Sequence, residues 1–224
     1  MGRRWPLVAS GAFVVLFVIS QAVVPPPPSV AASGEKVVSY YHHHAGGVRL
    51  SVWLVTIAGL FFVPVVALLR RRLSGIARDV MFFGAIGVGG QTVIWSWFSA
   101  GMALHPDALD PRTARTLTDI AAFYGPVLTA SIILLAVPIG LEAWADRGAF
   151  PKWLAPVTAV FVIEQAVETL TIFGRRGFTA PAGGMNLILG AGLFVIWVLA
   201  VGVAVSGDDR VAPEEHRIGA TRTR

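Results

Sequence analysis

Long apolar runs separated by short polar segments dominate the pattern of this chain. Each run is close to the roughly 20 residues that an α-helix needs to cross about 30 Å of hydrocarbon. The pattern predicts an all-α fold, a polytopic bundle of six membrane-spanning helices within residues 1–206, followed by a polar, disordered tail at 207–224. The predicted spans cover residues 5–24, 50–69, 80–104, 120–141, 153–173 and 185–206.

The polar segments between the runs suggest smaller elements. The proline run at residues 25–28 predicts a stiff, extended segment just outside the membrane. Ser33 is placed to open a short helix that precedes the second span. The loop that begins at His105 predicts an interfacial turn and then a new helix, with Thr118 or Asp119 as its cap.

Composition supports a membrane protein. Of the 224 residues, 55% are hydrophobic and only 14% are charged, whereas a soluble domain carries about 25% charged residues. The net charge of +5 could indicate nucleic acid, but arginines beside membrane helices explain the excess, and we expect no nucleic-acid partner. The absence of cysteine excludes disulfides and thiol catalysis.

The distribution of Lys and Arg predicts the orientation. With the N-terminus inside, 12 of the 18 basic residues fall in cytoplasmic segments. Basic residues concentrate on the cytoplasmic side of membrane proteins, so both termini are predicted to be cytoplasmic. Arg175 and Arg176 lie on the outer side in this arrangement and run against the trend.

The first apolar run has a second interpretation. A basic start, an apolar stretch and small residues near Ala31 and Ala32 are typical of a signal peptide. The apolar run is long for a signal core, and four prolines separate it from any cleavage site. We therefore expect a retained span; removal of residues 1–32 would leave five.

Two acidic side chains interrupt the fifth predicted span. Glu164 and Glu168 are four residues apart, which puts them on one face of a helix with Cβ atoms about 5–6 Å apart. An ionised carboxylate is costly at that depth unless it is paired or reaches water. Two such groups also repel each other, so we expect the pair to face the bundle interior and to share a proton.

The glutamate pair admits two interpretations. Acidic residues inside a membrane often mark a proton or cation pathway, which makes Glu164 and Glu168 candidate ion-binding residues. Alternatively, a protonated glutamate bonds a neighbouring helix, with Gln165, Gln91 or Thr92 as partners.

Other motifs predict no cofactor or catalytic site. Successive histidines on a helix point about 100° apart, so His42 and His44 are weak metal candidates that would need partners such as Asp107. The glycines of residues 84–90 lie inside an apolar run and indicate close helix packing rather than a nucleotide loop. Motifs of serine hydrolases, zinc proteases and P-loop proteins are absent.

One region resembles a known group. Val37, Tyr40, Tyr41 and His44 have the form V-x-x-Y-Y-x-x-H, and the span that follows ends in Leu69-Arg70-x-x-Leu73. In these positions the chain resembles a group of uncharacterised multi-pass membrane proteins of actinobacteria. The resemblance implies a bacterial inner-membrane location and a similar arrangement of spans, and it supplies no activity.

We expect a non-catalytic subunit or scaffold of the cell membrane, and two alternatives remain open. A non-catalytic subunit or scaffold, partnered by lipid and by other membrane subunits, fits the small size and the lack of an internal repeat. A small proton- or cation-linked transporter or solute-binding protein fits the carboxylate pair. A membrane enzyme acting on lipid is the third, and no catalytic motif supports it.

Overall fold

The computed structural model describes residues 4–207, and the predicted polar tail lies almost wholly outside them. Within this range the chain is helical and contains no strand, as the apolar pattern predicted. The α-helices are α1 (Trp5–Ala22), α2 (Gly34–Arg72), α3 (Gly75–Met102), α4 (Pro111–Ala122), α5 (Tyr124–Trp144), α6 (Leu154–Glu168) and α7 (Ala191–Ser206). Three short helical segments complete the described fold, η1 (Pro106–Ala108), η2 (Thr169–Phe173) and η3 (Met185–Gly190).

Six helical stretches of the described chain are long and apolar enough to cross a membrane. Each overlaps one of the predicted spans, and α4 with α5, α6 with η2, and η3 with α7 each count as one stretch. Large apolar side chains are exposed along these helices, for example Phe83 and Ile188, which is the surface that lipid covers. The chain is therefore an integral, multi-pass membrane protein.

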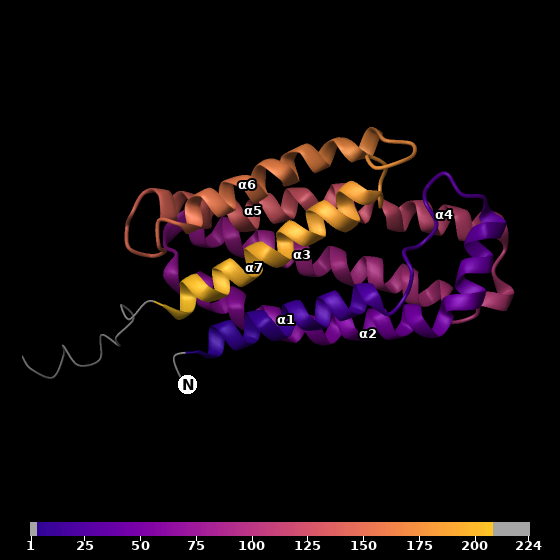
Figure 1. Ribbon diagram of the computed structural model, residues 1–224, viewed down its shortest axis with the longest axis horizontal. Helices are drawn as coiled ribbons and strands as arrows, with labels where there is room; N and C mark the ends of the chain where they lie inside the picture. Colours follow the sequence, from indigo (N-terminus) through magenta and orange to yellow (C-terminus); the bar gives the residue numbers. More distant parts are fainter. Residues whose placement is uncertain (1–3, 208–224) are drawn as a thin grey trace, which may run out of the picture.

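The spans pack lengthwise into one bundle (Figure 1). Helix α3 packs along α5, α1 lies between α2 and α7, and α6 packs on α5. The start of α1 and the end of α7 lie at the same end of the bundle, here called the terminal end. The opposite, distal end carries α4 and the loop of residues 174–184 (Figure 1).

Aromatic rings and close helix contacts hold the bundle interior together. Phe13 of α1 contacts the rings of Phe62 and Phe194, at centroid distances of 5.2 and 5.9 Å. Trp197 is buried, stacks on Phe161 and donates from its indole nitrogen to Thr158 Oγ1 at 3.1 Å. Helix α1 is thus packed into the core of the bundle.

The predicted packing role of the glycines in residues 84–90 is confirmed for two of them. A Cβ on Gly84 would overlap the backbone of Leu135, and one on Gly87 would overlap the Ser131 side chain. Glycine at these positions lets α3 approach α5 closely. The later glycines, Gly89 and Gly90, face open space.

The distal end has its own small apolar cluster. Two helix boundaries that the sequence predicted at this end were wrong. Ser33 does cap a helix, accepting from the Lys36 amide at 3.4 Å, but this helix is not short: it continues without a break through the second span as α2. Helix α4 begins at Pro111, capped by Asp110, and not at Thr118 or Asp119. Proline at the first helical position is favourable because its missing N–H would be unpaired anyway.

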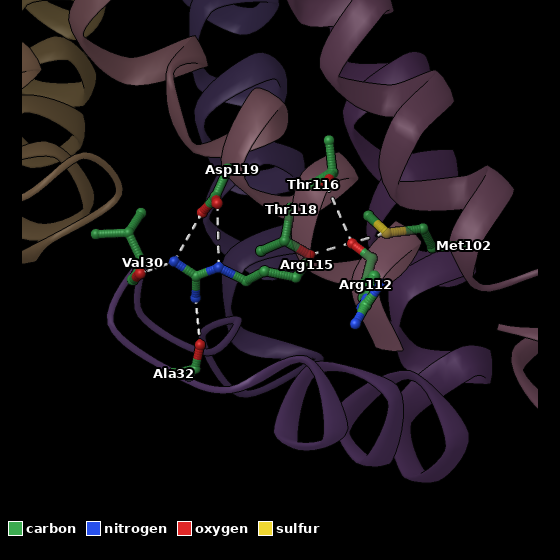
Figure 2. A network of polar contacts seen from close by, with 8 residues as sticks. All are labelled: Val30, Ala32, Met102, Arg112, Arg115, Thr116, Thr118 and Asp119. Carbon is green, nitrogen blue, oxygen red and sulfur yellow. Dashed lines mark hydrogen bonds and ion pairs between the residues drawn. The ribbon is translucent and has the colours of Figure 1, made fainter. Parts of the chain in front are cut away.

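Arg115 joins α4 to the extended segment of residues 23–33 (Figure 2). Its guanidinium donates to the carbonyl oxygens of Val30 and Ala32, and it also pairs with Asp119 at 3.0 Å. The Tyr40 hydroxyl holds the other side of the segment by donating to the Pro25 carbonyl at 2.8 Å. The proline-rich segment is therefore docked on the bundle by specific bonds.

Candidate functional site

The most unusual polar group in the bundle surrounds Glu164 and Glu168. Both carboxylates face the interior, where Glu164 is 8% exposed and Glu168 is 4% exposed. Gln165, between them in sequence, is 1% exposed, and its amide nitrogen donates to Glu164 Oε2 at 2.8 Å and to Glu168 Oε2 at 3.0 Å. A single amide thus bridges the two carboxyl groups from their own helix.

A second span completes the cluster. The side-chain amide of Asn186, in η3, donates to Glu168 Oε1 and lies 3.4 Å from Thr171 Oγ1 in η2. Sequence reasoning missed Asn186 and Thr171. A signal was present for Asn186, because it is an amide in the first turn of an otherwise apolar span. We call Glu164, Gln165, Glu168, Thr171 and Asn186 the carboxyl cluster.

Three buried oxygen atoms of the carboxyl cluster have no hydrogen-bond donor. They are Glu164 Oε1, Gln165 Oε1 and Asn186 Oδ1. A buried polar atom without a partner costs about 1–3 kcal/mol. Every one of these atoms is an acceptor, so the cluster can receive hydrogen bonds from a proton on a carboxyl group or from another donor.

Both helical spans become irregular at the carboxyl cluster. Helix α6 ends at Glu168 and tightens into the 3₁₀ segment η2, while the sixth span opens with the π-helical segment η3. Such breaks in α-helical bonding are often found at functional sites. In membrane proteins they also leave backbone groups free to serve a buried site.

A glycine makes room for the carboxylate of Glu168. A Cβ on Gly190 would overlap Glu168 Oε2, so only glycine allows the sixth span to pass this close to the acid. Gly125 of α5 has a similar role, because a Cβ there would lie 2.9 Å from the Asn186 amide carbon. Three spans therefore enclose the carboxyl cluster.

Gln91 and Thr92, considered as partners of the glutamates, lie in separate contacts. Gln91 donates to Ser131 Oγ at 2.7 Å, and Thr92 Oγ1 is 3.0 Å from the Tyr124 hydroxyl. Both link α3 to α5. Of the predicted partners, only Gln165 contacts the carboxylates.

The histidines of α2 form surface contacts at the distal end. His42 Nε2 pairs with Asp107 Oδ1 at 3.0 Å, one of the partners considered for a metal site. His44 lies against the Tyr40 ring, with centroids 5.1 Å apart. Within residues 4–207, no three His, Cys, Asp or Glu side chains are grouped so that they could hold a metal ion, and the structure gives His42 and His44 no further ligands.

Comparison with known proteins gives no match to this chain. No protein-family model, no curated protein and no solved structure matches this chain.

Proposed function

We propose that this membrane protein binds a proton at the Glu164/Glu168 pair and acts as a small proton- or cation-linked transporter or solute-binding protein. One observation carries the proposal: two carboxyl groups are buried side by side, joined by amide donors, while three neighbouring oxygens lack a donor. A proton on the pair removes one buried charge and supplies a donor.

The position of the carboxyl cluster supports access from the distal end. Glu168 is separated from the loop of residues 174–184 only by the five residues of η2, and Asn186 is the second residue of η3. Because both irregular segments adjoin that loop, a local opening there would bring water to the pair with the rest of the bundle intact. The distribution of arginines supports a cytoplasmic terminal end, in a bacterial cell membrane if the resemblance to the actinobacterial group holds.

The alternative, a non-catalytic subunit whose glutamates bond a partner helix, receives less support. That role needs acidic side chains on the outer surface of the bundle, whereas both carboxylates are enclosed by their own chain. Purification from native membranes in mild detergent tests it, because a subunit would carry a stoichiometric second chain with it.

Proton movement into liposomes tests the proposed function. The purified chain is reconstituted with a pH-sensitive dye inside the vesicles, and an imposed potassium diffusion potential, negative inside, draws protons inward. We expect acidification that is lost in the double variant Glu164→Gln/Glu168→Gln. Glu142→Gln is the control, because Glu142 pairs with Arg147 at 2.8 Å away from the cluster. Acidification no faster than in protein-free vesicles would contradict proton movement through the pair in the absence of a solute.

A further inference from the structure

A hollow of about 450 Å³ lies at the terminal end, beside the turn that connects α2 to α3. Its wall contains three arginines, Arg70, Arg71 and Arg78, together with the apolar side chains of Ala67 and Leu73. The carboxyl cluster belongs to α6 and η3, so the two sites share no residue. The hollow therefore needs an explanation of its own.

The charges in this hollow are poorly compensated. Within residues 4–207, Arg70 and Arg71 form no ion pair, and Arg78 has only its sequence neighbour Asp79, at 3.4 Å. The adjacent Arg72 differs, because it donates to the carbonyl oxygens of Ala149 and Val205 at 3.2 and 2.8 Å and so ties the bundle together. Among the described residues, the hollow therefore carries positive charge that its neighbours do not neutralise.

Two further features prepare the hollow for an anion. The Arg70 guanidinium lies 4.6 Å from the centroid of the Phe82 ring, which holds the charged group in place. The N-terminus of α3 adjoins it, and neither Ser74 nor an acidic residue in the first turn caps its free amides. Free amides at a helix N-terminus add to the attraction for negative charge.

The arginines of the hollow flank the apolar parts of two candidate membrane spans, which is where lipid headgroups are expected. Arg70 and Arg71 directly follow the apolar part of the second span, and Arg78 precedes that of the third. A guanidinium group can donate two parallel hydrogen bonds to the oxygens of one phosphate. Basic pockets between membrane helices recognise anionic headgroups. We propose that the hollow binds the phosphate of an anionic phospholipid, with Arg70 and Arg71 as its main contacts.

Retention of lipid in nanodiscs tests the proposal. The chain is incorporated into nanodiscs of phosphatidylglycerol and phosphatidylcholine, transferred to detergent, and analysed by native mass spectrometry for bound lipid. We expect retained phosphatidylglycerol in excess of its bulk fraction, and affinity lower by about fivefold for each arginine removed in Arg70→Gln/Arg71→Gln. Arg147→Gln is the matched control, an exposed arginine at the same end that already pairs with Glu142. Equal retention by the wild type and the double variant would overturn the proposal.

Two controls keep the result interpretable. Arg70→Lys/Arg71→Lys preserves the charge that orients the helices and should bind with intermediate affinity, because lysine cannot form the paired contacts of a guanidinium. A second arm titrates inorganic phosphate and glycerol phosphate into the detergent-purified chain. Binding of either as tightly as of phosphatidylglycerol would contradict a lipid ligand and identify a water-soluble phosphate compound instead.

Discussion

The side-chain amide of Asn186, in the sixth span, donates a hydrogen bond to the Glu168 carboxylate in the fifth span. The two residues are 18 positions apart, and the bond ties the irregular start of the sixth span to the end of α6. Because Asn186 and Gln165 supply the only donors to Glu168 among the hydrogen bonds of the described residues, the bond is central to the stability of the carboxyl cluster.

Replacing Asn186 should therefore destabilise the protein. Asn186→Ala leaves one oxygen of Glu168 without its donor, and a buried group that loses its partner costs about 1–3 kcal/mol. We expect a lower melting temperature in detergent, followed by tryptophan fluorescence. Gln21→Ala is the control, because Gln21 is exposed and bonds only its neighbour Ser20. Equal melting temperatures for wild type and Asn186→Ala would argue against this contact.

Charge at Glu164 should matter more than shape. Glu164→Gln keeps the size of the side chain and removes a buried acid, so the chain should fold and reach the membrane at wild-type levels. Glu164→Lys puts an ammonium group at a site that is 8% exposed, where a charge costs several kcal/mol, and should abolish accumulation. Quantitative blotting of membrane fractions measures both variants, and equal expression would count against burial of this side chain.

Two glycines of the sixth span should respond in opposite ways to the same change. Gly190→Ala drives a methyl group into Glu168 Oε2 and should displace the carboxylate, lowering stability by about 1–3 kcal/mol as overpacking does. Gly192→Ala meets nothing within 4 Å and should stabilise the helix by roughly 0.5–1 kcal/mol. Thermal unfolding compares the two variants, and a shared sign of the change would refute the close approach at Gly190.

Removing the guanidinium of Arg115 should detach the proline-rich segment from α4. Arg115→Ala removes the donors to the Val30 and Ala32 carbonyls, and each bond to a charged group contributes about 1.5–3 kcal/mol. Hydrogen exchange at the amides of residues 29–33 should speed up, while the core of the bundle stays protected. Arg112→Ala, which changes an exposed side chain on the same helix, should leave exchange in this segment unchanged; equal acceleration in both variants would contradict the docking.

Acid should loosen the start of α4. The Thr113 amide and hydroxyl donate to the Asp110 carboxylate at 2.9 and 3.1 Å, and these bonds hold the pKa of Asp110 below its ordinary value. Because the pKa is lower in the folded chain, the cap stabilises the helix above the unfolded pKa and is lost as the pH falls through the folded one. Exchange at the Thr113 amide should therefore rise in acid relative to its intrinsic rate. Asp110→Asn, which keeps a cap that does not titrate, should flatten this response.

The apolar pattern was sufficient to predict the number of spans and the burial of the glutamates. The length of each apolar run predicts a membrane-spanning helix. The i, i+4 spacing of Glu164 and Glu168 puts both side chains on one face of such a helix. The pattern could not predict that Asn186 meets Glu168, because pairing between spans depends on how helices rotate and tilt against one another.

Helix boundaries at the distal end were harder to predict. The sequence predicted a short helix opened by Ser33 and then a separate second span, yet α2 runs through both as one helix. The extension is stable because Val37 and Tyr41 bury their side chains against Met102 and Ala114. Tertiary packing of this kind leaves little trace in local sequence. The start of α4, by contrast, could have been predicted. Asp110 followed by Pro111 is a typical helix start, and the prediction of Thr118 or Asp119 as the cap missed it.

Infrared spectroscopy of the carboxyl groups tests the central claim most directly. Wild-type protein in lipid at neutral pH should show the C=O stretch of a protonated carboxylic acid, which shifts in D₂O only slowly because the pair is buried. The band should be absent from Glu164→Gln/Glu168→Gln and unchanged in Glu142→Gln. A wild-type spectrum at neutral pH that contains only ionised carboxylates would contradict a shared proton on Glu164 and Glu168.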